Sequence, residues 1–142
     1  NDYELLKSNK IFRSINRHIY DYDYLKEKIR NSNSHISIVY NQIIKLIEVR
    51  KKQKAFHPNA TQYTLNIGNN FFGLWRQSID RKQSIFAISN VTNKKQTLSL
   101  DKINILSLES WYDLLSLSEV KSNQKKLIFN PYQTVWIANK KN

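Results

Sequence analysis

The residues whose types suit chemistry begin with Arg17, which stands between Asn16 and His18. A guanidinium group is planar and can satisfy a carboxylate and two hydroxyl groups at once, which a lysine ammonium cannot do. From the spacing alone, an arginine on a surface loop is an equally good interpretation. Arg17 is therefore a candidate binding residue that needs support from the rest of the chain.

Histidine titrates near neutral pH, so His57 could act as a base or as a metal ligand. It precedes Pro58 and Asn59, and no second His, Cys or carboxylate stands at ligand spacing. The sequence favours a structural hydrogen-bonding role for His57, and the same holds for His35. The chain also has no cysteine, which excludes disulfides and thiolate metal sites. We expect no metal and no cofactor.

Trp75, Trp111 and Trp136 could form a platform on which a sugar ring stacks. In short strands of a small sandwich, however, tryptophans more often belong to the core. The sequence favours the core interpretation and leaves sugar stacking as the alternative.

Charge limits the expected partners. The 142 residues carry a formal net charge of +12, but most of the 23 basic residues are lysines scattered along the chain. Segments that bind nucleic acid usually interleave aromatic and basic residues, and none is visible here. No apolar run is long enough to span a membrane. We expect neither nucleic acid nor a membrane as a partner. With no signal peptide and Asn rather than Met first, the pattern indicates a cytoplasmic protein with a truncated start.

Helical signals dominate the first third of the chain. Residues 1–20 show no sustained period and are expected to form a loop. Asp21 is a candidate N-cap for a helix over 22–31. A second cap signal at 32–34 precedes a long helix that reaches Lys54 and carries one apolar stripe. That stripe repeats at helical spacing through Ile36, Val39, Tyr40, Ile43, Leu46, Ile47 and Arg50.

After His57-Pro58 the apolar residues recur at every second position instead of at helical spacing, which predicts strands. Six short strands are expected, at 63–67, 71–76, 84–91, 96–100, 125–129 and 134–138. The third and fourth would be joined around Asn93, and the last two would pair around Asn130-Pro131. Residues 111–115 are expected to begin as a strand and end in a turn. The pattern predicts a small antiparallel sandwich.

Four motifs, in this order and spacing, resemble one enzyme group. They are Ile15-Asn16-Arg17-His18, the phrase RKKQKAFHPNA over 50–60, Trp111 with Asp113-Leu114-Leu115, and Pro131-Tyr132-Gln133 with Trp136. The set resembles sucrose phosphorylase-like enzymes of glycoside hydrolase family 13, in the alpha-amylase clan. That group includes sucrose, sucrose-6-phosphate and glucosylglycerate phosphorylases, and the resemblance covers essentially the whole chain.

The resemblance implies an α+β fragment. In such enzymes a TIM-type (β/α) barrel precedes a small antiparallel β-sandwich. Residues 1–56 would be the C-terminal end of the catalytic barrel, a loop plus two helices. Residues 57–142 would be the C-terminal all-β domain.

The resemblance also implies a reaction. Such enzymes are retaining: a carboxylate attacks the anomeric carbon, a carboxylic acid protonates the leaving sugar, and phosphate takes the glucosyl group. Both carboxylates would lie upstream, and none of Asp2, Glu4, Asp21 and Asp23 matches their motifs. The parent protein would act on sucrose or a related alpha-glucoside, and this chain alone would be non-catalytic. Sugar and phosphate would be partners only through the barrel, which the chain would contact intramolecularly.

Arg17 takes its role from the same resemblance. In similar enzymes the arginine of this turn lies at the bottom of the donor pocket, where it pairs with an aspartate and bonds the far hydroxyls of the glucosyl ring. Asn16 and His18 would hold the loop. The family often has an acidic residue where this chain has Ser14, so the chain departs from the family pattern in this loop but keeps the arginine.

Two functions remain open on the sequence. The first is the C-terminal part of a phosphorylase, whose β domain supports the barrel and whose loop completes the donor pocket. The second is a free-standing basic β-module that binds carbohydrate or polyanion. The first predicts that one side of the long helix stays uncovered, and the second that the sandwich covers it.

Overall fold

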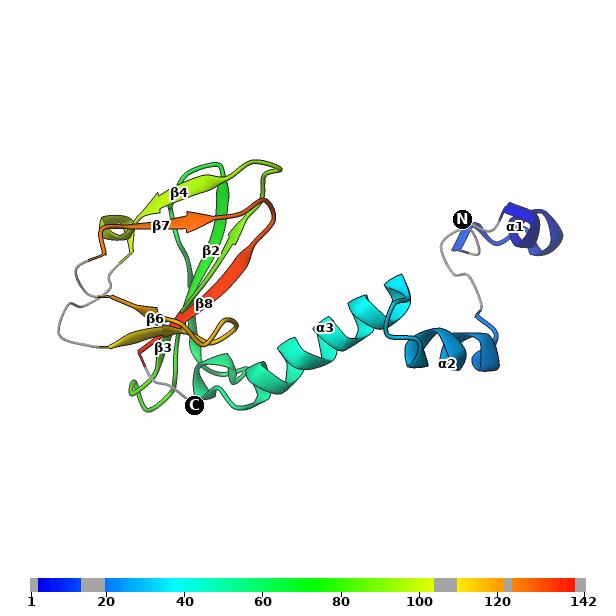
Figure 1. Cartoon of the computed structure of the whole chain (residues 1–142), viewed down its shortest axis with the longest axis horizontal. Helices are drawn as coiled ribbons and strands as arrows, with labels where there is room; N and C mark the ends of the chain where they lie inside the picture. Colours follow the sequence, from blue (N-terminus) through cyan, green and yellow to red (C-terminus); the bar gives the residue numbers. More distant parts are fainter. Residues whose placement is uncertain (1–2, 14–19, 104–109, 122–123, 140–142) are drawn as a thin grey trace. The chain divides into compact units, whose positions relative to one another are not determined.

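The computed structural model describes residues 3–13, 20–103, 110–121 and 124–139 (Figure 1). Two compact units divide the chain, Asn1–Ile44 and Lys45–Asn142, and their boundary falls inside helix α3, His35–Lys51. The described elements of the first unit are helices, and the second is mainly antiparallel β-sheet. This confirms the expected mixture of helices and antiparallel strands. The barrel, and the division at residue 56, stay predictions.

Helix α1 corrects one expectation. The predicted loop over 1–20 is wrong for part of its length, because Tyr3–Asn9 forms a helix. The side chains of Glu4 and Lys7 form an ion pair, with 2.8 Å between Lys7 Nζ and Glu4 Oε1, and their order suits the helix dipole. A single pair of this kind stabilises a turn without creating an apolar period, which is why periodicity missed the helix.

Helices α2 and α3 begin at the predicted caps. In α2, Tyr22–Arg30, the Asp21 carboxylate accepts a hydrogen bond of 2.8 Å from the Tyr24 N–H. In α3 the Ser34 hydroxyl accepts one of 3.0 Å from the Ser37 N–H. Helix α3 ends at Lys51 rather than at Lys54, because Gln53 adopts extended backbone with φ −95° and ψ 117°.

The β-strands of the second unit form two sheets in the part of the chain that the structure describes. One sheet has six strands in the order β1-β2-β3-β8-β5-β6. The other pairs β4 with β7, which lie side by side in Figure 1. The strands are β1 Thr61–Thr64, β2 Phe71–Gln77, β3 Ser84–Asn90, β4 Gln96–Ser99, β5 Trp111–Asp113, β6 Glu119–Val120, β7 Lys126–Phe129 and β8 Thr134–Ala138. All pairs are antiparallel. Strand β6 was not predicted, because two residues show no alternation.

The strand pairing differs from the expected hairpins. Strand β8 pairs with β3 and β5, whereas β7 pairs with β4, so the expected last pair around Asn130-Pro131 is wrong. The physical reason lies at Asn90, which is 2% exposed. Its Nδ2 donates to the Lys94 carbonyl at 2.7 Å and to the Asn130 carbonyl at 2.8 Å. The Asn90 side chain therefore holds both the β3–β4 connection and the β7–β8 connection, where the chain passes from one sheet to the other.

The main core lies between the two sheets. It joins apolar side chains of the large sheet to Leu98 of β4 and Phe129 of β7, and it includes Trp111, which is 2% exposed. Trp111 therefore confirms the core interpretation, and Trp75 and Trp136 are half-buried beside the clusters. A second cluster unites Ala55, Ile85, Leu114 and Ala138.

Candidate functional site

The residues predicted to bind substrate cannot be placed. Arg17 and its neighbours Asn16 and His18 lie outside the described residues, and so does Ser14. Their roles stay predictions. The local geometry that the structure does describe concerns the connector between α3 and β1.

The connector is the segment 53–60, whose centre is the short 3-10 helix η2, Lys54–Phe56. Ala55 is fully buried and packs in the second cluster, and the Phe56 ring lies 4.9 Å from the Trp136 ring between centroids. This segment was singled out in the sequence through the phrase over 50–60 and through His57-Pro58. In the structure they form a docked turn rather than a free linker.

Two polar side chains of the sheet hold the connector. Gln83, 7% exposed, accepts from the Ala55 N–H at 3.0 Å and donates to Gln53 Oε1 at 2.7 Å. The Arg76 guanidinium donates to the carbonyls of Ala55 at 2.9 Å and His57 at 2.7 Å. An arginine fork can bond two carbonyls at once because its N–H groups are fixed in one plane. The connector is therefore rigidly tied to β2 and to the start of β3.

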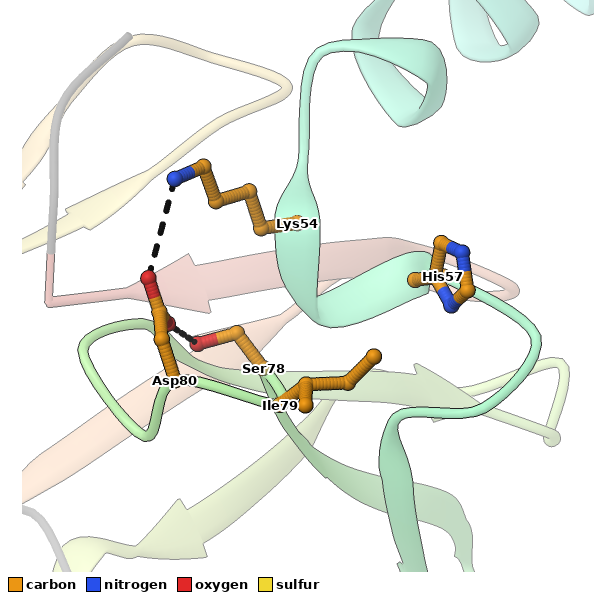
Figure 2. Close-up of a pocket in the computed structure, with 5 residues that line it drawn as sticks. All are labelled: Lys54, His57, Ser78, Ile79 and Asp80. Carbon is orange, nitrogen blue, oxygen red and sulfur yellow. Dashed lines mark hydrogen bonds and ion pairs between the residues drawn. The ribbon is translucent and has the colours of Figure 1, made fainter.

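A hollow of about 310 Å³ lies beside the connector. It is lined by Lys54, His57, Ser78, Ile79 and Asp80. Figure 2 shows Lys54 reaching from the connector toward Asp80, while Ile79 points toward His57. Ile79 is 65% exposed and gives the hollow an apolar wall.

Asp80 stays ionised down to low pH. Its pKa is lowered from the ordinary 3.8 to about 2, first by the hydrogen bond from the Ser78 hydroxyl and then by the bond from the Lys82 N–H. These bonds to Asp80 Oδ1 measure 2.6 Å and 3.1 Å. Lys54 Nζ adds its positive charge 3.6 Å from Asp80 Oδ2.

The groups around this hollow are engaged in structural bonds. The Ser78 hydroxyl donates to Asp80, whose low pKa makes it a weak base, and accepts from the Gln83 N–H at 2.9 Å. His57 Nδ1 accepts from the Asn59 N–H at 3.1 Å, as its predicted structural role requires. Within the described residues, no group of three His, Cys, Asp or Glu could hold a metal ion. These bonds hold the turn around Asp80 and the end of the connector in place.

Helix α3 presents a second candidate surface, the apolar stripe. Five of its side chains are exposed by roughly two fifths to one half: Val39, Tyr40, Ile43, Leu46 and Ile47. Within the second unit, the sandwich leaves Leu46 39% and Ile47 41% exposed. In the described part of the chain, no helix combines the length and apolarity needed to cross a membrane. Contiguous exposed apolar side chains of this kind are typical of a binding surface.

Sequence reasoning missed the polar residues that fix the connector. Arg76 ends one predicted strand, and Asp80 and Gln83 lie between that strand and the next, where the sequence gives no sign of a role. The partners of Gln83 and Arg76 in the connector lie 28 and 21 residues away in sequence. No local signal marks such pairs.

Comparisons with known proteins agree with the enzyme group that the motifs indicate. No protein-family model matches the chain. A glucosylglycerate phosphorylase of Spirochaeta thermophila is 30% identical over 84 residues, which are 59% of this chain and 14% of that protein. The crystal structure of AmyP in complex with maltose matches with a TM-score of 0.63 and 11% identity, over 78% of this chain and 22% of AmyP. The likeness to AmyP shows a shared fold, and neither match singles out sucrose phosphorylase.

Proposed function

We propose that this chain is the C-terminal part of a retaining glycoside phosphorylase of family 13. The parent enzyme would transfer a glucosyl group from sucrose or a related alpha-glucoside to phosphate, by the two-carboxylate chemistry of retaining enzymes. The chain would supply no catalytic carboxylate. It would support the barrel, and Arg17 would complete the donor pocket.

The observation that carries the proposal is the exposed stripe on α3. A helix in a protein buries its apolar face against another element, and this helix leaves its apolar face open at Ile43, Leu46 and Ile47. The similarity to a glucosylglycerate phosphorylase, of which the chain spans 14%, supports a barrel as the missing surface. The stripe is where the phosphorylase interpretation predicts uncovered side chains.

The free-standing module is less well supported. It predicts that the sandwich covers the stripe, whereas Leu46 and Ile47 stay exposed within the second unit. It also predicts that lysines and aromatic residues of the sandwich line one groove. A hollow rich in basic residues does occur, but α3 and the connector line it, not the strands.

The first experiment is to read the coding DNA upstream of the codon for Asn1. The proposal expects a few hundred codons in frame, encoding barrel strands with an aspartate nucleophile and a glutamate acid. A start codon and promoter at Asn1, with no barrel gene nearby, would overturn it.

A second experiment tests the stripe itself. In the chain as given, we expect Ile43→Asn to change the free energy of unfolding by less than about 0.5 kcal/mol, because this side chain is 50% exposed. In the longer enzyme the same change should cost about 2 kcal/mol or more, because the side chain would be buried there. Denaturation of both proteins measures the difference. Equal small effects in the two would show that no barrel covers the stripe.

A further inference from the structure

Five basic residues are among those that line a second hollow, of about 410 Å³, where α3 meets the connector. They are Arg50, Lys51, Lys52, Lys54 and His57, and all lie within the compact unit Lys45–Asn142. Lys54 and His57 also border the hollow shown in Figure 2. The basic residues therefore gather around the connector, which is held to the sheet by Gln83 and Arg76.

The charge of this hollow is largely uncompensated. Within the described residues Arg50, Lys51 and Lys52 make no ion pair, and Lys54 meets Asp80 at 3.6 Å. The end of α3 contributes a partial negative charge of about half an elementary charge, which is smaller than three full positive charges. An anion placed here gains attraction from several sides.

The other residues that line the hollow indicate which kind of anion would fit it. His57 Nδ1 already accepts from the Asn59 N–H, so His57 Nε2 is left as an N–H donor. Phe56 is half-buried and Ile47 is 41% exposed, and both line the same hollow as apolar groups. Its volume falls within the usual range for small-molecule sites. Several donors and one apolar wall suit an anion with several acceptor oxygens and an apolar body.

We propose that this hollow binds a phosphate-bearing small molecule, with the phosphate among the basic residues and its apolar part against Phe56. A phosphate group carries close to two negative charges at neutral pH and has three strong acceptor oxygens. It can therefore accept from more than one of the five basic groups at a time.

The test uses the full chain labelled with ¹⁵N, at constant ionic strength. Inorganic phosphate, phenyl phosphate and phenol are added separately while amide shifts are followed. We expect saturable shifts confined to residues 47–57 with both phosphates, and no saturable shift with phenol. Contact of the ring with the apolar wall should make phenyl phosphate bind about tenfold tighter than inorganic phosphate.

Paired variants separate a built site from general attraction to a basic protein. Replacing Lys51 and Lys52 together by glutamine should weaken binding about fivefold or more, because two exposed charges are removed. Lys94 and Lys95 are exposed between β3 and β4 and do not line the hollow. Replacing both by glutamine removes the same amount of charge and should leave binding unchanged. Unchanged amide spectra in the absence of phosphate establish that both variants fold.

Two results would overturn the proposal. One is a set of shifts that grow linearly and spread over all lysines, which would mean screening by ions alone. The other is an equal loss of affinity in both paired variants, which would mean that net charge rather than this hollow attracts phosphate. Should either paired variant lose its native spectrum, Lys52→Gln alone against Lys95→Gln alone decides the same question.

Discussion

Replacing Gln83 with alanine removes the side chain that fastens the connector to the sheet. Gln83 Oε1 accepts from the Ala55 N–H at 3.0 Å, and Gln83 Nε2 donates to Gln53 Oε1 at 2.7 Å. Both partners are buried, since Ala55 is 0% and Gln53 4% exposed. Neither can turn toward water without opening the connector.

Two losses set the size of the effect. A buried N–H that loses its acceptor costs about 1–3 kcal/mol, and this applies to Ala55. The lost bond to Gln53 removes about 1 kcal/mol more. We therefore expect Gln83→Ala to lower the free energy of unfolding by about 2–4 kcal/mol.

Urea denaturation followed by tryptophan fluorescence measures this change. Trp136 is a suitable reporter because its ring lies 4.9 Å from the ring of Phe56 in the connector. Gln124→Ala is a matched control: its Nε2 donates to the Lys126 carbonyl at 2.9 Å, but at an exposed position. The control should change the free energy of unfolding by less than about 0.5 kcal/mol.

A double-mutant cycle gives the stricter test. If Gln83 and Gln53 act together, the effects of Gln83→Ala and Gln53→Ala should fall short of additivity by about 1 kcal/mol. Additivity within about 0.5 kcal/mol would refute the network, and so would a Gln83→Ala effect no larger than that of the Gln124 control.

Two further predictions concern charged groups. The pKa of Asp80 is lowered to about 2 in the folded chain, so its contribution to stability is complete above the unfolded value of 3.8 and is lost as the pH falls toward 2. The difference in urea stability between the parent chain and Asp80→Asn should shrink across that window, and a constant difference would contradict it. In the proposed parent enzyme, Arg17→Lys should lower kcat/KM for phosphorolysis about 10- to 100-fold, because lysine cannot form the paired bonds of a guanidinium. Arg13→Lys in the same segment is the control. Equal losses of kcat/KM in the two variants would show that Arg17 has no special role in the donor pocket.

Local signals allowed much of the fold to be predicted. Asp21 and Ser34 cap their helices as expected, because a cap depends on residues within one turn. The alternating strands were located to within a few residues for the same reason. Helix α1 was missed because its stabilising pair, Glu4 with Lys7, leaves no apolar period.

Pairing between strands could not be predicted in the same way. The register of β3 with β8 pairs Ile85 with Ala138, which is far away in sequence. The side-chain amide of Asn90 donates to the carbonyl of Asn130, forty residues later, where the chain passes from one sheet to the other. The connector shows the same limit, since Gln83 and Gln53 stand 30 residues apart. The predicted role of Arg17 in a donor pocket stays a prediction, because Arg17 lies outside the described residues.

The position of β8 has a consequence for how the second unit forms. This strand, the last of the described strands in chain order, lies inside the large sheet between β3 and β5. During synthesis, the edge of β3 that pairs with β8 stays unpaired until β8 has left the ribosome. Pairings between distant segments are slow to form, and an unpaired strand edge invites association with other chains. The sandwich therefore completes its fold late, and its yield in a cell should depend on how long that edge stays open.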